Sequence, residues 1–338
     1  MVGDIIMVVI FRQFFDSVSS TYTYLISSGK GREALIIDPV FEKTDQYIKL
    51  LNELDLRLIK VIDTHIHADH VSGIAELRNR TKCITIMGEQ APGDIVSMHV
   101  KDNERISIEK LNLTALYTPG HTDDSYSFLM NDKVFTGDTL LIKGTGRTDF
   151  QNGNPYDQYN SLFERLLKLP DETYIYPAHD YKGESVSTIG EEKKFNPRLQ
   201  VSSAQEYASI MNNLNLSNPK MMDVALPTNK NQGFTIEKQK KLNGISYNQL
   251  KKLSDSDDIV LVDLREFNEI KTKSSLPNSI HIPYSNLQEH LINKKNELKN
   301  KKLIFYCAIG ERSALAIQIS QALQFKKTYH LVGGINNI

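Results

Sequence analysis

The sequence predicts a two-domain α/β protein, and three observations support this. First, 338 residues exceed what one ordinary hydrophobic core holds together. Second, β-rich runs alternate with turns and a few helices over the first two-thirds of the chain, and a strand–helix alternation restarts near residue 245. Third, residues 227–244 between them are rich in Lys, Asn and Gln. We therefore expect a first domain over residues 8–229, a linker over 230–244 and a second domain over 245–338.

The first domain is predicted to be rich in strands. Apolar residues at helical spacing predict a helix over residues 47–54, and a second helix over 161–169 ends before Pro170. The apolar run at residues 5–11 is too short to span a membrane and lacks the flanks of a signal peptide, so we expect a strand there. The dipeptide Asn131-Asp132 is a hairpin signal. Further β-rich runs bounded by turn residues predict strands over residues 22–26, 34–37, 58–62, 84–87, 113–117, 126–130, 134–136 and 174–176.

The second domain is predicted to be a small unit built on a parallel sheet. Strands are expected over residues 259–262, 279–282 and 303–306, and a helix over 313–323. Strands that alternate with helices favour parallel pairing, because each helix returns the chain to the same edge of the sheet. The lysine-rich residues 294–302 are expected to form the solvated face of a helix.

Charge and cysteine content exclude several classes of function. Lys and Arg total 40 against 41 for Asp and Glu, so the formal net charge is −1 and no overall field attracts nucleic acid or an anionic membrane. The two cysteines, Cys83 and Cys307, cannot form a disulfide framework, which favours a reducing compartment. Cys83 begins a buried strand and is expected to be a structural thiol. With no targeting segment evident, we expect a cytoplasmic protein.

Candidate metal ligands gather at the ends of predicted strands. His65, His67, Asp69 and His70 fall within six residues, directly after the strand over residues 58–62. Loops at the carboxyl ends of strands can point their side chains into one cavity, as a metal ion requires. Three more residues of ligand type follow other strands, beside Gly or Pro: His121, Asp138 and His179. The set as a whole predicts a metal site.

The THxHxDH segment at residues 64–70 is the signature of the metallo-β-lactamase superfamily, which the chain resembles over roughly residues 11–233. The resemblance implies an αββα sandwich of two mixed sheets with the metal at one edge. Hydrolases of this superfamily, such as glyoxalase II, hold two metals. The residues that match the ligands of one metal are His65, His67 and His121, and those that match the ligands of the other are Asp69, His70 and His179. Asp138 matches the residue that bridges the two metals. The alternative is a mononuclear site of His65, His121 and Asp138, the facial triad of non-haem Fe(II) oxygenases.

Flanking segments favour the mononuclear alternative. Residues 19–24, 143–151 and 177–199 resemble persulfide dioxygenases of the mitochondrial ethylmalonic-encephalopathy type and their bacterial relatives. The resemblance implies oxidation of glutathione persulfide by O₂ to sulfite and glutathione, at one Fe(II) ion per chain on His65, His121 and Asp138. It also implies that four further residues hydrogen-bond these ligands or water and fix their orientation: His67, Asp69, His70 and His179.

The substrate implied by this resemblance carries two carboxylates, so cationic and phenolic groups are expected at the mouth of the site. Four residues in loops that match the family are the candidates: Arg147, Tyr181, Lys182 and Arg198. For Lys182 and Arg198 the alternative is a surface salt bridge. The implied reaction needs no protein nucleophile in this domain, which agrees with the sequence around the predicted ligands.

The second domain contains a different candidate site. Cys307 follows a strand and precedes a helix, where the helix dipole and backbone N–H groups favour a thiolate. Arg312 adds a fixed positive charge and can brace the loop. The CxxGxRS pattern at residues 307–313 resembles the active-site loop of rhodanese domains, which implies transfer of sulfane sulfur through a Cys307 persulfide. Four residues separate Cys307 from Arg312, one fewer than in related phosphatases, so the loop suits sulfur better than a phosphoryl group.

The two resemblances together imply a chain that makes sulfite and moves sulfane sulfur between glutathione persulfide and sulfite or thiosulfate. The loop interior holds Ala308, Ile309 and Glu311 in place of cationic residues, so a persulfide carried on a thiol is expected to be preferred over free thiosulfate. The family resemblance also implies a homodimer.

Two alternatives remain open. One is a binuclear thioester hydrolase of the glyoxalase II type. The other is a second domain that only carries sulfur, senses redox state or docks partners. The second alternative draws on the end of the chain, which comes four residues after Gly334, where rhodanese domains usually continue into a closing helix.

Overall fold

The computed structural model describes residues 9–93, 95–253 and 258–338, which form two compact units. One unit comprises the chain up to Gln232 apart from residues 96–98, and the other comprises residues 96–98 and Gly233–Ile338. The strand expected over residues 5–11 begins outside the described residues, as does the expected start of the first domain at residue 8. The first strand, β1, spans Ile10–Asp16.

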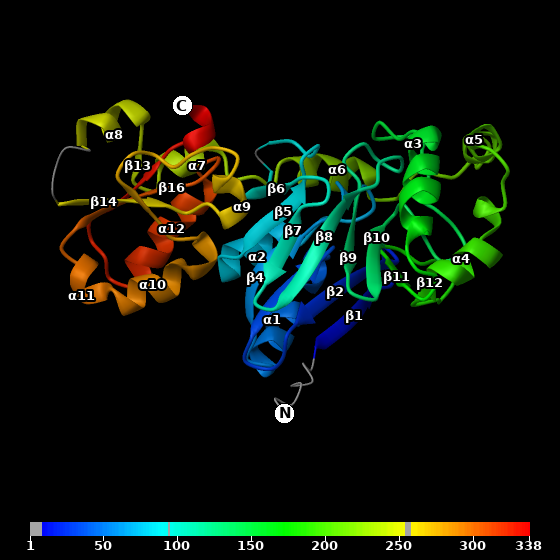
Figure 1. The fold of residues 1–338 in the computed structure, drawn as a ribbon, viewed down its shortest axis with the longest axis horizontal. Helices are drawn as coiled ribbons and strands as arrows, with labels where there is room; N and C mark the ends of the chain where they lie inside the picture. The colour runs from blue at the N-terminus through cyan, green and yellow to red at the C-terminus, as the bar shows by residue number, and fades with distance from the viewer. Residues whose placement is uncertain (1–8, 94, 254–257) are drawn as a thin grey trace. The chain divides into compact units, whose positions relative to one another are not determined.

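Two mixed six-stranded sheets form the body of the first unit (Figure 1). The first sheet has the order β1-β2-β3-β4-β5-β6, with the further strands β2 (Thr21–Ser27), β3 (Glu33–Ile37), β4 (Arg57–Ile62), β5 (Ile84–Gly88) and β6 (Met98–Val100). The second has the order β12-β11-β10-β9-β8-β7, with β7 (Arg105–Ile108), β8 (Leu111–Tyr117), β9 (Tyr126–Met130), β10 (Lys133–Gly137), β11 (Tyr174–Pro177) and β12 (Ser187–Thr188). Parallel pairs such as β3–β4 and β10–β11 occur beside antiparallel pairs such as β1–β2 and β8–β9. The expected sandwich of mixed sheets is confirmed.

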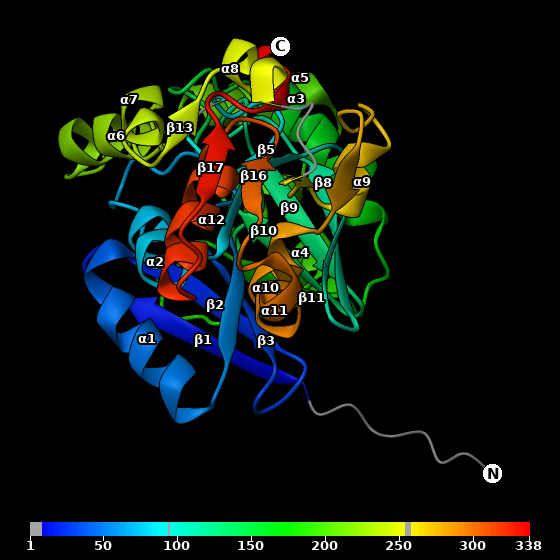
Figure 2. The ribbon, with the colours of Figure 1, turned by 90° about the vertical axis from the view of Figure 1, so that its left-hand side faces the viewer.

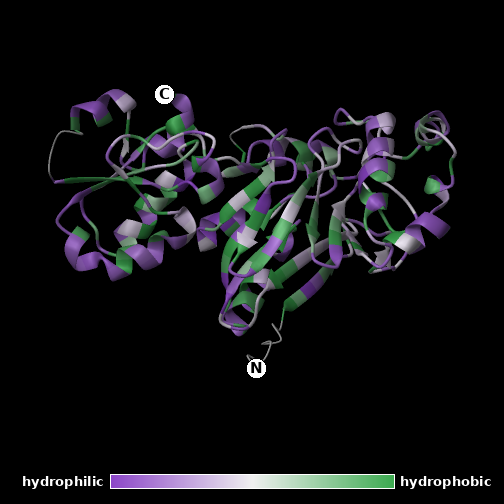
Figure 3. Cartoon of the chain, in the orientation of Figure 1, coloured by the Kyte–Doolittle hydropathy of each residue, from purple (hydrophilic) through white to green (hydrophobic). Residues whose placement is uncertain are grey.

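Helices cover the outer sides of this sandwich (Figure 1). Apolar side chains of the strands fill the space that the sheets enclose, and in Figure 3 the strands are predominantly hydrophobic where the outward helices are hydrophilic. Two helices follow strands of the first sheet: α1 (Thr44–Glu53) and α2 (Ile74–Thr81). α3 (Pro155–Asn160) lies between β10 and β11 of the second sheet, and three more helices follow β12: α4 (Ile189–Phe195), α5 (Ala204–Asn212) and α6 (Met222–Lys230).

The helix expected over residues 161–169 begins six residues earlier. The side chain of Asn154 accepts hydrogen bonds from the N–H groups of Tyr156 and Asp157, and Pro155 fits the first helical position. The helical path then continues as a π-helical turn over Ser161–Arg165 and a 3₁₀ turn over Leu166–Lys168. The predicted end of this helix before Pro170 is correct, whereas its N-terminal cap at Asn154 was not predicted.

The carboxyl ends of four strands position the seven predicted ligands. The loop after β4 carries His65, and the loops after β8, β10 and β11 carry His121, Asp138 and His179. Gly137, which ends β10, has φ of 53°, and a Cβ atom there would lie 2.9 Å from Oγ1 of Thr64. Only glycine fits this turn without strain and without displacing the residue next to His65.

The second unit contains a five-stranded, entirely parallel sheet of order β13-β17-β16-β14-β15. The strands are β13 (Gly244–Ile245), β14 (Ile259–Asp263), β15 (Ser279–His281), β16 (Lys302–Tyr306) and β17 (Thr328–Leu331). In Figure 2, β16 and β17 lie side by side, with α12 packed along them. The helices are α7 (Ile236–Lys240), α8 (Tyr247–Leu253), α9 (Phe267–Ile270), α10 (Leu287–Asn293), α11 (Lys295–Leu298) and α12 (Glu311–Ala322). The predicted parallel unit is confirmed.

The segment expected to be a linker is folded. Residues 230–244 contain α7, whose first turn is capped by the Oγ1 atom of Thr235, and they begin β13. The side chain of Gln232 donates to the carbonyl of Ser72, and Gln239 is buried. Polar composition misled the prediction because these amides make buried hydrogen bonds instead of facing water.

Membrane insertion by a helix finds no support in the described part of the chain. None of the helices there combines the length and the apolar character that a bilayer crossing requires.

Candidate metal centre and sulfur-transfer loop

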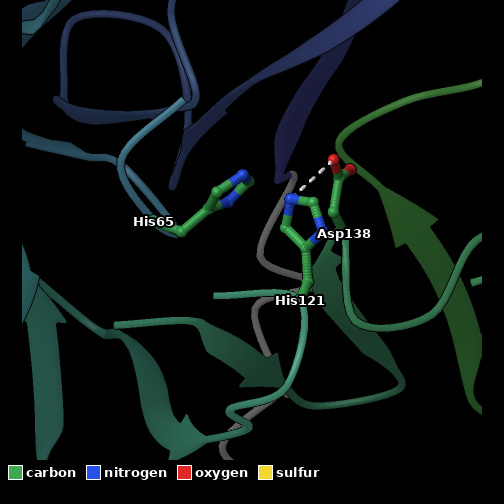
Figure 4. Close-up of side chains that lie close together, drawn as sticks. All are labelled: His65, His121 and Asp138. Carbon is green, nitrogen blue, oxygen red and sulfur yellow. Dashed lines mark ion pairs between the residues drawn. The ribbon is translucent and has the colours of Figure 1, made fainter. Parts of the chain in front are cut away.

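Three buried side chains from three loops converge in the first unit (Figure 4). The candidate ligand atoms of His65, His121 and Asp138 all lie within 4.8 Å of one another. Nε2 of His121 is 3.5 Å from Oδ2 of Asp138, and the rings of His65 and His121 meet edge to face with their centroids 4.9 Å apart. This group can hold one metal ion with two imidazole nitrogens and one carboxylate oxygen.

Hydrogen bonds behind the two histidines fix their tautomers. Nδ1 of His65 lies 2.9 Å from Oγ1 of Thr64, whose proton goes to the Asp38 carboxylate at 3.0 Å, so Nδ1 is the donor. Nδ1 of His121 donates to the carbonyl of Arg147 at 2.7 Å. A neutral imidazole that donates from Nδ1 carries its lone pair on Nε2. Burial and the neighbouring histidines lower the pKa of His65, which keeps that ring neutral and able to bind a metal.

His179 orients the carboxylate of Asp138. Its Nδ1 lies 2.6 Å from Oδ1 of Asp138, and its Nε2 lies 2.8 Å from Oδ2 of Asp69. Because carboxylates only accept, His179 donates from both nitrogens and is an imidazolium. Burial opposes that charge, but the two carboxylates raise the pKa of His179 well above its ordinary value. The same contact outweighs burial at Asp138 and lowers the pKa of that carboxyl.

His67 and His70 form the other side of the site. Nε2 of His67 lies 3.1 Å from Oδ1 of Asp38, and Nδ1 of His70 lies 2.8 Å from Oδ2 of Asp69. Burial opposes protonation of His67, but the Asp38 carboxylate raises its pKa to about 9. Within the part of the chain that the structure describes, Nδ1 of His67 and Nε2 of His70 have no hydrogen-bond partner. His67, Asp69 and His70 form a second group whose candidate ligand atoms lie close enough together to hold a metal.

A cavity of about 640 Å³ opens beside the candidate metal centre and is large enough for a tripeptide-sized ligand. His121, Asp138 and His179 line it. The four residues predicted to bind the substrate line it too, so the fold brings them together with the metal ligands: Arg147, Tyr181, Lys182 and Arg198.

Arg147 shapes the wall of this cavity. Its guanidinium donates to both carboxylate oxygens of Asp149, at 2.5 and 2.6 Å, and stacks over the ring of Phe150. It also donates to the carbonyls of Leu216 and Ser217, at 3.1 and 2.7 Å. Arg147 thus holds residues 216–221 against the cavity and has fewer donors left for a substrate carboxylate.

The other three residues present different groups to the cavity. The ring of Tyr181 is 69% exposed and lies parallel to the ring of His179, with the centroids 6.1 Å apart. Arg198 is half-buried and donates to Oγ1 of Thr145 at 3.1 Å. Lys182 is exposed, with Nζ 3.3 Å from the carbonyl of Lys143. A further exposed ammonium group, Lys220, lines the cavity and was missed in the sequence, where no motif surrounds it.

Cys307 lies at the end of β16, in a loop that leads into α12. Its side chain is fully buried, and its Sγ atom accepts the N–H of Gly310 at 3.2 Å. Gly310 adopts φ of 90°, and a Cβ there would collide with the side chain of Gln239. The loop therefore folds around the sulfur with the N–H of Gly310 as a donor, at the N-terminus of a 12-residue helix.

Arg312 braces this loop from behind. Both of its terminal nitrogens donate to Glu269, each at 2.6 Å, in a bidentate pair. Burial opposes the charge, but Glu269 raises the pKa of Arg312 further, so its charge is permanent. The expected positive charge is present and is balanced by a carboxylate that sequence reasoning missed.

Other supporting residues were also missed. Asp38 and Thr64 fix His65, and Gln239 bridges the carbonyl of Ile309 and the N–H of Gly333 beside Cys307. The Asp38-Pro39 strand end was a signal that could have revealed Asp38. Gln239 lies in the segment expected to be a linker, where nothing in the sequence marked it.

Comparison with known families defines the class of protein. The metallo-beta-lactamase superfamily model matches residues 16–92 and 88–179, and the rhodanese-like domain model matches residues 246–338. The chain therefore joins a metallo-β-lactamase domain, which contains the candidate metal centre, to a rhodanese-like domain, which contains Cys307.

Individual relatives show which family within the superfamily the chain belongs to. The mitochondrial persulfide dioxygenase ETHE1 of Homo sapiens is 42% identical over 227 residues, which are 67% of this chain and 89% of the relative. The crystal structure of ETHE1 from Myxococcus xanthus is 49% identical, covers 65% of this chain and 98% of that one, and superposes with a TM-score of 0.64. A probable hydroxyacylglutathione hydrolase of Schizosaccharomyces pombe is 32% identical over 247 residues, 63% of this chain and 93% of the relative. The chain belongs to the persulfide dioxygenase family, with a rhodanese-like domain as its second unit, and the resemblance seen in the sequence is confirmed.

Proposed function

We propose that the first unit oxidises glutathione persulfide with O₂, at one Fe(II) ion per chain held by His65, His121 and Asp138. Glutathione persulfide, O₂ and water give glutathione, sulfite and two protons. The observation that carries this proposal is the group of two Nε2 atoms and one carboxylate, each fixed by a hydrogen bond from behind, beside a cavity of tripeptide size. When bound, iron supplies the redox chemistry that lets O₂ react with sulfur.

The chain's own residues bind and orient the substrate. Lys182, Arg198 and Lys220 place positive charge at the cavity, where the two glutathione carboxylates need it. Arg147 keeps the wall in place through Asp149. His179 holds the Asp138 carboxylate in one orientation, so its second oxygen stays directed at His121.

The second unit transfers sulfane sulfur through Cys307. The Cys307 thiolate attacks the outer sulfur of glutathione persulfide, which forms a Cys307 persulfide and releases glutathione. Sulfite then takes the sulfane sulfur as thiosulfate and regenerates the thiolate. Because both units share one chain, sulfite formed by the first is present at a raised effective concentration for the second.

The test is the output of thiosulfate from glutathione persulfide and O₂ by the full chain. Cys307→Ser is expected to abolish thiosulfate and leave O₂ uptake intact, whereas Asp138→Ala is expected to abolish O₂ uptake but keep sulfur transfer to added sulfite. Cys83→Ser and Asp132→Ala are the matched controls, since Cys83 is a buried thiol before β5 and Asp132 is an exposed turn residue. Loss of both activities in both variants would contradict two separate sites.

A binuclear thioester hydrolase is the second candidate. It is favoured by His67, Asp69 and His70, which form a second group close enough to hold a metal. It is opposed by His179, whose two nitrogens are both occupied by carboxylates. Metal analysis separates the two candidates: about one iron per chain supports the oxygenase, and two zinc or mixed metals with thioester hydrolysis support the alternative.

Three expectations from the sequence stay predictions. These are a homodimer, a cytoplasmic location and the absence of nucleic-acid or membrane partners. Sedimentation of the purified chain measures the first, and fractionation of the host cell measures the second.

A second unit that only carries sulfur is the remaining alternative. It would form the Cys307 persulfide in a single turnover and then fail to discharge it to sulfite or glutathione.

A further inference from the structure

Cys307 lies at one end of a line of three buried side chains. Its Sγ atom is 3.8 Å from Oγ of Ser313, and Oγ of Ser313 is 3.2 Å from Nδ1 of His330. The three residues come from the end of β16, the first turn of α12 and β17, and all three are fully buried. Since the Cys307 side chain is buried in this arrangement, the hydroxyl of Ser313 offers an acceptor inside the fold for a proton that leaves the sulfur.

The structure fixes which nitrogen of His330 can accept. Nε2 lies 2.9 Å from the backbone carbonyl of Gln239, which only accepts, so Nε2 carries the proton. Nδ1 therefore directs its lone pair at Ser313. Burial lowers the pKa of His330, which keeps the ring neutral and leaves Nδ1 without a proton. The hydroxyl of Ser313 is also 3.0 Å from the carbonyl of Gly310, so its single proton has a choice of two acceptors.

We propose that Ser313 and His330 form a proton relay that takes the thiol proton of Cys307 for sulfur transfer. This inference rests on the proposed role of Cys307 as the sulfur carrier and deepens it. The S–H bond of Cys307 breaks as its proton moves to Oγ of Ser313, and the hydroxyl proton of Ser313 moves to Nδ1 of His330. A thiolate and an imidazolium result, and the reverse transfers restore the thiol.

Burial makes this relay favourable over release of a proton to water. A lone thiolate in a water-excluded site is costly, whereas a thiolate paired with an imidazolium leaves the net charge of the buried group unchanged. The thiolate also accepts the N–H of Gly310 at the start of α12. His330 acts through Ser313 and is therefore a positioning residue that also holds the proton.

Most other ionisable groups near His330 are compensated or exposed, whereas Glu311 is buried in the first turn of α12. Arg312 on α12 is paired with Glu269, and Tyr306 on β16 donates to Asp263. The remaining titratable groups on the elements packed against His330 are Lys302 on β16, Glu311 on α12, Tyr329 on β17, and Glu237, Lys238 and Lys240, which are exposed on α7. Among the described residues, the hydrogen bonds of Ser313 connect His330 to Cys307.

The test uses the full chain with Cys83→Ala, so that Cys307 is its only thiol. The rate of Cys307 alkylation by iodoacetamide is followed by intact mass from about pH 5 to about pH 9. His330→Asn and Ser313→Ala are each expected to move the midpoint of the rate profile up by about one pH unit and to lower the rate near neutrality about tenfold. The double variant is expected to add nothing further, because both residues serve one relay.

Two controls separate a relay from a structural role. Ser313→Thr keeps the hydroxyl and is expected to retain the original midpoint. His281→Asn changes another histidine of this unit, whose Nε2 donates to the carbonyl of Arg265, and is expected to have no effect. The relay is overturned when His330→Asn lowers the plateau rate without moving the midpoint, or when Ser313→Thr behaves like Ser313→Ala.

Alkylation requires no sulfur donor, so this result is independent of the proposed sulfur transfer. A shifted midpoint in the variants supports the relay even where glutathione persulfide fails to load Cys307. That failure would instead contradict the proposed function of the second unit.

Discussion

Nδ1 of His179 lies 2.6 Å from Oδ1 of Asp138, and this contact sets the direction of the candidate metal-binding carboxylate. The opposite nitrogen of His179 is held by Asp69 at 2.8 Å, so the ring cannot turn without breaking two charged hydrogen bonds. The second oxygen of Asp138 is left to face His121. A residue of ligand type in the sequence thus holds the carboxylate of another candidate ligand in place.

Replacing His179 therefore weakens metal binding without removing a ligand. We expect His179→Gln to lower the affinity for iron about 10- to 100-fold, since outer partners of metal ligands contribute effects of this size. Titration of the metal-free chain with Fe(II) against a competing chelator measures the change. His290→Gln, on α10 of the second unit, is the control and should bind iron as the original chain does. Unchanged affinity in His179→Gln would show that Asp138 needs no support.

Asp149 anchors Arg147 and, through it, the wall formed by residues 216–221. We expect Asp149→Asn to raise KM for glutathione persulfide about threefold to tenfold with little change in kcat, because the wall loosens while the metal ligands keep their positions. Steady-state O₂ uptake measures both constants. Asp171→Asn removes a comparable exposed pair with Lys193 and should leave KM unaltered. A fall confined to kcat would argue against a role in substrate binding.

Glu269 compensates the buried charge of Arg312 and also caps α9 by accepting the N–H of Glu266. We expect Glu269→Ala to lower the free energy of unfolding of the second unit by about 3–5 kcal/mol, since it leaves a buried guanidinium unpaired. Urea denaturation measures this. Glu297→Ala removes an exposed pair with Lys294 and should cost under about 1 kcal/mol. Equal losses of unfolding free energy in the two variants would mean that the buried pair stabilises the unit no more than an exposed pair does.

The lowered pKa of His330 predicts how the stability of the second unit depends on pH. The unfolded chain, with a histidine pKa of about 6.5, binds more protons than the folded chain as pH falls through that value. The contribution of His330 is therefore fully present above about pH 6.5 and is lost as pH falls below it. Thermal melts of the original chain and of His330→Asn across this range measure the effect: the variant should show the shallower decline, and parallel declines would refute the assignment.

The sequence alone determined the two-unit α/β architecture, the family and the residues that could bind a metal or carry sulfur. These features follow from local patterns: strand runs ending beside Gly or Pro, seven residues of ligand type at strand ends, and a cysteine between a strand and a helix. Each pattern lies within a few consecutive residues, so no long-range information was needed to recognise it.

The tertiary structure decided which partner each of these residues has. Thr64 and Asp38 fix His65, Glu269 pairs with Arg312 across 43 positions of sequence, and the carbonyl of Gln239 sets the tautomer of His330. Such partners are brought together by sheet pairing and helix packing between distant segments, and an isolated Gln or Glu carries no local signal of them. Polar composition even predicted a linker where α7 is folded, because burial of a polar side chain depends on the partner that the fold supplies.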